Sequence, residues 1–171
     1  MQNSKRDKSH KRDEKLESHL NGLNVLLKSL EKKKLSKAPV SFDYPLILVM
    51  GAPRSGTTYL MQQLSSTGLF GYPSNFISRF YDAPFIGCSI QKLFTDYDKL
   101  DEFPEFNLEF NYQSKLGKTK GVLAPNEFWY FWRRFIKIDD NSSLSNEKIA
   151  EIDFNTLKKE LSLMISSFEK P

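Results

Sequence analysis

Residues 45–60 read PLILVMGAPRSGTTYL, and the fold expected for the chain follows from them. The continuous apolar run Leu46–Met50 is typical of a strand that is buried on both faces. The turn-forming residues Gly51–Gly56 come next. Thr57–Thr67 then places apolar residues on one helical face, and Gly68 stands where a helix commonly ends. The order strand, glycine loop, helix predicts an α/β protein.

The glycine spacing in this loop is that of a phosphate-binding loop. Gly51 is followed by Gly56, Thr57 and Thr58, an arrangement in which backbone N–H groups and a helix N-terminus face an oxyanion. A Walker A loop has a lysine where this chain has Thr57, and the cation here is Arg54, inside the loop. One such cation suits a phosphosulfate or a single phosphate better than a triphosphate with magnesium. The alternative is an ordinary glycine turn between a strand and a helix.

The same residues resemble the 5′-phosphosulfate loop of sulfotransferases, enzymes that use 3′-phosphoadenosine 5′-phosphosulfate (PAPS). The most specific part of the resemblance is Pro-Arg-Ser-Gly-Thr-Thr at residues 53–58. It implies a P-loop-like parallel sheet with flanking helices, and PAPS as the cofactor. The residues that it implies for binding the 5′-phosphate and the sulfuryl group are Arg54, Ser55, Gly56, Thr57 and Thr58.

Two further stretches, residues 73–84 and 126–134, resemble bacterial members of the family more weakly. The family's 3′-phosphate site is an Arg-Asp-Pro type turn with a serine eight residues after the arginine, and no such turn occurs in this sequence. Arg134 and Ser142 have the spacing without the motif.

Strand patterns are also scarce, because only Leu46–Met50 is a clear one and Val122–Ala124 is a candidate for a second. A buried strand needs hydrogen-bonded neighbours on both sides. The missing strands and the missing second phosphate site together predict that residues 42–171 are the N-terminal portion of a sulfotransferase domain. The sheet is accordingly expected to be incomplete at the C-terminus.

The reaction implied by the resemblance is transfer of a sulfuryl group from PAPS to an acceptor hydroxyl or amine. Arg54 would stabilise the charge on the transferred group, and a general base must take the acceptor's proton. Both histidines, His10 and His19, precede the loop, so a carboxylate is expected as the base. Glu127 is the first candidate because it opens an aromatic helix that could line an acceptor pocket, and Asp82 is the second. The alternative for Glu127 is a first-turn carboxylate favoured by the helix dipole.

Two other functions stay open at this point. One is a P-loop kinase, which the missing lysine disfavours, and the other is a non-catalytic phosphate-binding module whose sheet a partner chain completes. The sequence contains no cluster of metal-ligating residues. It gives neither the acceptor, whether small molecule, glycan or peptide, nor the oligomeric state.

Composition narrows the class of protein further. The single cysteine, Cys88, excludes a disulfide framework and a zinc site built on paired cysteines. The longest apolar run, Leu46–Met50, is too short to span a bilayer, and no basic-then-apolar leader opens the chain. A cytoplasmic protein without a transmembrane segment is therefore expected.

The basic excess lies in residues 1–41, which read as an N-terminal extension. Residues 1–37 contain 11 Lys and Arg against 5 Asp and Glu. Leucines at positions 16, 20, 23, 27 and 30 mark one face of a helix, which is expected to pack against its own domain. A basic run of this kind can bind nucleic acid or an anionic membrane. Because no aromatic residues alternate with the charges, a solvated extension without a clear nucleic-acid site is expected.

Overall fold

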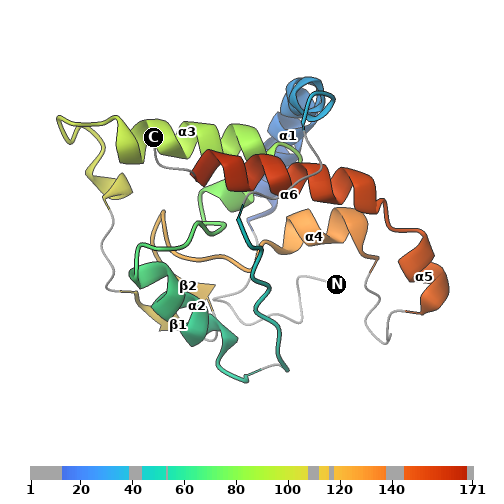
Figure 1. The fold of residues 1–171 in the computed structure, drawn as a ribbon. Coiled ribbons are helices and arrows are strands. Elements are labelled where there is room, and N and C mark those ends of the chain that lie inside the picture. Colours follow the sequence, from blue (N-terminus) through green and yellow to red (C-terminus); the bar gives the residue numbers. More distant parts are fainter. Residues whose placement is uncertain are drawn as a thin grey trace.

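The computed structural model describes residues 13–38, 44–52, 54–107, 112–115, 118–137 and 145–168 (Figure 1). Its elements, in chain order, are α1 (Glu14–Leu35), α2 (Thr57–Ser66), the short 3-10 helix η3 (Ile77–Arg79), α3 (Pro84–Asp96), the short 3-10 helix η4 (Pro104–Phe106), β1 (Ser114–Lys115), β2 (Lys118–Thr119), α4 (Trp129–Phe135), α5 (Asn146–Ala150) and α6 (Phe154–Phe168). Within these ranges, every helix is too short or too polar to cross a membrane.

The core of the molecule is formed by helices. α3 packs against α6, α1 contacts both of them, and α4 lies beneath α6 in the view of Figure 1. The side chains buried at this junction are Ile77, Cys88, Phe128, Phe131, Leu161 and Met164. Phe128 and Phe131 stack with their ring centroids 4.6 Å apart. Phe128 and Phe131 thus supply the core, and Trp132 and Phe135 pack against it.

The expected α/β fold, a P-loop-like parallel sheet with flanking helices, is wrong for this structure. The described residues contain no parallel strands, and their one sheet is the antiparallel pair β1–β2, in which Ser114 faces Thr119. Leu46–Met50 is not part of any strand, and its side chains are largely exposed, up to 85% for Met50. The apolar run lacks hydrogen-bonded neighbours among the described residues, so it cannot form the buried strand that its composition favours.

The second expected strand, Val122–Ala124, is also not formed. These residues make a series of bends, although Leu123 and Ala124 are buried. Their carbonyl groups bind the turn before η3, since Asn75 N donates to Ala124 O and Phe76 N donates to Val122 O. The segment thus meets its backbone hydrogen-bonding requirement without a sheet.

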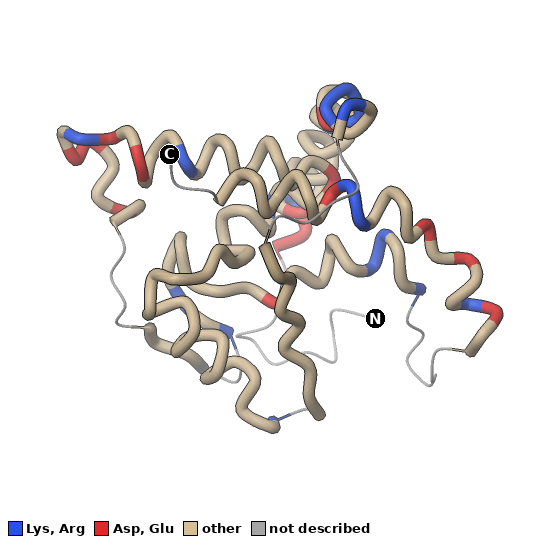
Figure 2. The backbone as a smooth tube through the Cα atoms, viewed as in Figure 1, with Lys and Arg blue, Asp and Glu red and all other residues tan. Residues whose placement is uncertain are grey.

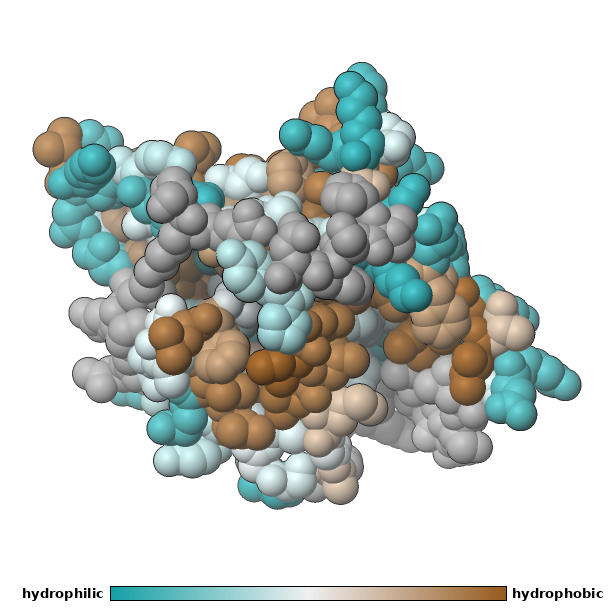
Figure 3. All heavy atoms as spheres, in the orientation of Figure 1, coloured by the Kyte–Doolittle hydropathy of each residue, from teal (hydrophilic) through white to brown (hydrophobic). Residues whose placement is uncertain are grey.

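An apolar surface remains where the sheet was expected. Figure 3 shows it in brown in the lower half of the molecule, over the extended segment before the loop and over α2. The exposed apolar side chains of this region include Leu46, Ile47, Leu48, Met50, Leu60 and Leu69.

The N-terminal helix α1 is capped locally and docked onto the rest of the chain. Asp13 accepts hydrogen bonds from Lys15 N and Leu16 N at 3.0 and 3.1 Å, which satisfies two of the free N–H groups at the helix start. Docking against its own domain agrees with the sequence analysis. The face that docks differs from the expected one, because Asn24 and Glu31 are the buried residues of α1.

Two polar side chains of α1 bind backbone groups of the neighbouring elements. Asn24 Nδ2 donates to Arg79 O at 2.7 Å, and Asn24 Oδ1 accepts from Asp82 N at 2.9 Å. The carboxylate of Glu31 accepts from Phe85 N and Ile86 N at 2.8 and 3.2 Å, so α1 caps the N-terminus of α3. The leucines at 20 and 27 lie at the edge of this contact, half-buried.

The burial of Glu31 predicts a stability that falls as the pH rises. Burial raises the pKa of Glu31 from 4.5 to about 7, against the opposing effect of the Phe85 and Ile86 N–H groups. Between these two pH values the folded chain binds more protons than the unfolded chain, so raising the pH favours unfolding. We expect the free energy of unfolding to decrease by roughly 3 kcal/mol from pH 4.5 to pH 7 and to level off above pH 7.

Urea denaturation at several pH values measures this effect. Burial also raises the pKa of Glu160, which adds a change in the same direction. Glu31→Gln should therefore remove most of the pH dependence and leave the part due to Glu160. An unchanged pH profile in Glu31→Gln would contradict the assignment to Glu31.

Candidate anion-binding loop

The described residues of the loop, 51–52 and 54–58, fold back toward its first glycine. Ser55 N donates to Ala52 O at 3.1 Å, which closes the turn. A Cβ atom at Gly51 would overlap Ser55 Oγ and approach Thr57 Cγ2, so a side chain at position 51 would require the side chains of Ser55 and Thr57 to move. Gly56 has a φ of 87°, in the left-handed region that favours glycine. The geometry of the loop thus favours glycine at both positions of the pattern, 51 and 56.

Arg54 is the isolated charge of this region. It is the only charged residue between Asp43 and Arg79, and Figure 2 shows the tube of α2 in tan. Its backbone φ of 66° is also left-handed, which is uncommon for a residue other than glycine. Its side chain is exposed, and no described acidic residue forms an ion pair with it. A cation in this environment is available to an external anion.

The N-terminus of α2 opens directly from the loop. Gly56 is its N-cap and supplies no side-chain hydrogen bond, and the first turn contains no acidic residue. The first backbone N–H groups of a helix have no partner within the helix and carry partial positive charge. Arg54, Ser55, Gly56, Thr57 and Thr58 therefore surround an uncapped helix start, and their binding of a phosphosulfate stays a prediction.

Polar contacts along α2 fix the helix that carries this turn. Gln62 Nε2 donates to Thr119 Oγ1 at 2.9 Å, and Ser65 Oγ donates to the Tyr112 hydroxyl at 3.0 Å. Tyr72 lies next to Tyr112 and donates to Leu123 O at 3.0 Å. Burial, reinforced by the neighbouring Tyr112 hydroxyl, raises the pKa of Tyr72, which keeps it a neutral donor. These contacts hold α2 in place beyond its first turn, and the first turn itself has no side-chain cap.

The two weaker sequence stretches meet in space. Asn126 Nδ2 donates to Asn75 Oδ1 at 2.7 Å, and Asn126 N donates to Pro73 O at 2.9 Å. Asn75 Nδ2 also donates to Thr119 O and Gly121 O, and the hydroxyl of Thr119 binds Gln62 of α2. These two asparagines connect the support of the loop to the aromatic core. Sequence reasoning missed them because their partners lie about fifty residues apart.

Glu127, the first candidate for the general base, is exposed. Its Oε2 accepts a hydrogen bond from the indole Nε1 of Trp129. Glu127 precedes α4, because Phe128 has a φ of 55° and the helix begins only at Trp129. No described contact joins Glu127 to the loop, so its role as a base stays a prediction.

Asp82, the second candidate, is an ion-pair partner inside the molecule. Its Oδ1 lies 2.9 Å from Arg134 Nε and 3.1 Å from Lys28 Nζ. Arg134 also forms two hydrogen bonds of 2.7 Å with Glu160 and one of 2.6 Å with Tyr81 O. These contacts engage Arg134 fully, which argues against a second phosphate site there, and Ser142 lies outside the described residues.

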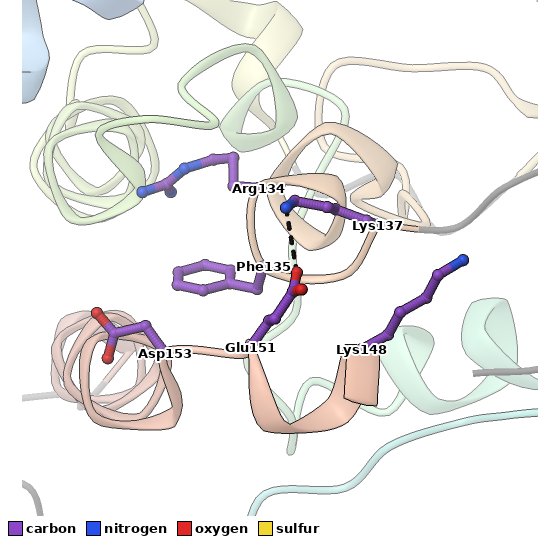
Figure 4. Close-up of a pocket in the computed structure, with 6 residues that line it drawn as sticks. All are labelled: Arg134, Phe135, Lys137, Lys148, Glu151 and Asp153. Atoms are coloured by element: carbon purple, nitrogen blue, oxygen red, sulfur yellow. Dashed lines mark hydrogen bonds and ion pairs between the residues drawn. The ribbon is translucent and has the colours of Figure 1, made fainter. Parts of the chain in front are cut away.

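A pocket of about 240 Å³ lies on another part of the surface, where the end of α4 meets α5 and the start of α6 (Figure 4). Its lining residues are Arg134, Phe135, Lys137, Lys148, Glu151 and Asp153. The charges in it are largely satisfied within the chain, since Lys137 Nζ lies 3.2 Å from Glu151 Oε2 and Asp153 caps α6 through Thr156. Figure 1 shows α2 and α5 at opposite ends of the molecule, so this pocket is separate from the loop.

Comparisons with known proteins add no further assignment. No family model, curated protein or solved structure matches the chain. The described residues also contain no group of three or more side chains that could hold a metal ion. A functional assignment therefore depends on the loop itself and on the motif that it carries.

Proposed function

We propose that the chain binds the 5′-phosphosulfate end of PAPS in the loop Gly51–Thr58, and that it transfers the sulfuryl group to an acceptor hydroxyl or amine. The observation that carries this proposal is the combination of an unpaired Arg54 with an uncapped helix start around a tightly closed glycine loop. The Pro-Arg-Ser-Gly-Thr-Thr motif at residues 53–58 supports the sulfotransferase assignment over other phosphate-binding proteins.

The charges of the loop favour a single terminal anion. Arg54 is the one side chain of the loop that can neutralise charge, and a guanidinium binds two oxygens of one tetrahedral group. A triphosphate with magnesium carries more charge and requires a metal-holding carboxylate. No acidic residue lies in the loop or in the first turn of α2. The loop therefore suits a phosphosulfate better than it suits ATP.

The proposed reaction is an in-line displacement at sulfur. The acceptor oxygen or nitrogen forms a bond to the sulfur atom while the bond between sulfur and the bridging phosphate oxygen breaks. Adenosine 3′,5′-bisphosphate leaves, and the acceptor's proton passes to a general base, for which we propose Glu127. Arg54 and the N–H groups at the start of α2 would stabilise the charge on the transferred group and on the leaving phosphate.

Arg54→Ala is expected to weaken binding of adenosine 3′,5′-bisphosphate roughly 10- to 100-fold, because charge-assisted hydrogen bonds to the anion are lost. Turnover of PAPS, followed through release of the bisphosphate, should fall roughly 100-fold or more. Isothermal titration calorimetry measures the first effect. The matched control is Arg133→Ala, which removes an exposed arginine outside the loop and should leave binding unchanged.

Titration with ATP and magnesium distinguishes the proposal from a kinase on the same loop. We expect ATP with magnesium to bind more weakly than adenosine 3′,5′-bisphosphate. The reverse order would favour the kinase. Binding of the bisphosphate without any turnover of PAPS would favour a non-catalytic phosphate-binding module, and equal binding by wild type and Arg54→Ala would remove the loop from the site.

A further inference from the structure

Helix α1 docks onto the rest of the chain through a stripe of polar residues. At alternating steps of four and three residues, the stripe consists of Glu17, Asn21, Asn24, Lys28 and Glu31. This spacing places all five side chains on one face of the helix. Asn24 and Glu31 are the buried residues of α1, and its leucines are exposed or half-buried. The contact that holds α1 is therefore mainly polar.

The polar stripe reaches the segment between η3 and α3, and also α4. Lys28 Nζ lies 3.1 Å from Asp82 Oδ1, and Glu17 accepts a hydrogen bond from the hydroxyl of Tyr130 in α4. The hydrogen bonds of the two buried residues, described above, complete the contact. When a helix leaves, polar contacts of this kind are exchanged for contacts with water, so their net contribution to docking is small.

The buried core does not depend on α1. Among the described residues, every side chain of the core cluster, and each apolar side chain packed against it, comes from η3 or from a later part of the chain. The C-terminal end of α1 projects beyond α3 and α6 at the top of Figure 1. Departure of α1 would therefore leave the core packed.

Glu31 is the titratable group at this contact. Arg134 of α4 and Glu160 of α6 act on its carboxylate, the first in favour of the charged form and the second against it. The other charged or titratable groups of the elements packed there are Lys28 and Lys34 of α1, Asp82 before α3, and Cys88 of α3. Burial is the largest influence, and it raises the pKa of Glu31 from 4.5 to about 7. In a released helix this pKa would return to its ordinary value.

Docking of α1 is therefore linked to the proton on Glu31. Between pH 4.5 and about pH 7 the docked helix holds this proton and a released helix does not, so a rise in pH favours release. Above about pH 7 the carboxyl group is charged in both forms, and the effect levels off. These values predict an opening constant that rises about 20-fold from pH 5.5 to pH 7.5.

We propose that α1 is a pH-sensitive latch, which opens from the folded body of the molecule as one unit when Glu31 loses its proton and closes when Glu31 regains it. The opening is local, because the contact is polar and the core lies elsewhere. It uncovers the N–H groups of Asp82, Phe85 and Ile86, which donate to side chains of α1 in the closed state.

Amide hydrogen exchange of the full chain, followed by NMR from about pH 5.5 to about pH 7.5, tests the proposal. After correction for the pH dependence of intrinsic exchange, the amides of Asp82, Phe85 and Ile86 should share one opening constant, which rises about 20-fold over this range. The amide of Met164, buried in α6, reports unfolding of the core. Its opening constant should be at least about 10-fold smaller.

Two variants identify the group that controls the latch. Glu31→Gln removes the titrating carboxyl group, so the opening constant of the three amides should change by less than about 3-fold over the same pH range. His19→Gln is the matched control, because His19 is exposed on α1 and histidine ordinarily changes charge in this range. This variant should keep the full pH dependence.

Three amides that open no more often than Met164 at any pH would overturn the proposal, because α1 would then leave only when the core unfolds. Opening that is independent of pH in the wild type would also overturn it, as would a pH dependence that is lost in His19→Gln and retained in Glu31→Gln. If Glu31→Gln fails to fold, the wild-type exchange of the three amides against Met164 decides the question.

Discussion

Replacement of Arg134 by methionine is expected to lower the free energy of unfolding by roughly 3–5 kcal/mol. Arg134 is the only described cation in contact with Glu160, whose residue is 3% exposed, and it shares Asp82 with Lys28. Methionine keeps the apolar contact with Phe131 and Phe135 but leaves the two carboxylates without the guanidinium. The cost is large because a buried charge without a partner is far less favourable than a paired one.

Urea denaturation at pH 7 measures this loss, with Lys137→Met as the matched control. Lys137 pairs with Glu151 at 3.2 Å, but both side chains are mostly exposed. Its replacement should change the free energy of unfolding by less than about 0.5 kcal/mol. The double variant Arg134→Met/Glu160→Leu should regain most of the stability, because it removes the buried carboxylate together with its partner. A double variant as unstable as Arg134→Met alone would contradict this account.

The helix start next to the candidate loop was predictable because it is specified by neighbouring residues. Arg54, Ser55, Gly56, Thr57 and Thr58 are neighbours in sequence, and the helix start that they surround is specified locally by Gly56 and the apolar spacing of α2. The start of α6 is specified in the same local way, since Asp153 caps it through Thr156 three residues later. Interactions between residues that are so close in sequence are encoded in the local sequence pattern.

The sheet and the general base were not predictable in this way. An apolar run such as Leu46–Met50 has the composition of a buried strand, but a strand also needs partners, and these are specified by distant residues. Asp82 was a reasonable base in sequence, yet Arg134 and Lys28 reach it from 52 and 54 positions away in the chain. Sequence patterns at single positions cannot distinguish a free carboxylate from a paired one.

Asn24 of α1 illustrates the same limit, because the sequence and the structure predict opposite effects of one substitution on stability. From sequence, Asn24 interrupts a leucine-rich helix face, and Asn24→Leu should stabilise the helix because leucine has the higher helix propensity. In the structure Asn24 is 0% exposed and bonds to Arg79 O, Asp82 N and Leu20 O. Leucine would leave the first two of these backbone groups buried without a partner.

We therefore expect Asn24→Leu to lower the free energy of unfolding by roughly 2–4 kcal/mol, because each stranded backbone group costs about 1–3 kcal/mol. Leu23→Asn, one position away, is the matched exchange. Leu23 is 40% exposed, so asparagine there should cost less than about 1 kcal/mol, mainly through helix propensity. Urea denaturation of the two variants and the wild type measures both effects. If Leu23→Asn were the more destabilising of the two, the leucines rather than Asn24 and Glu31 would hold α1 in place.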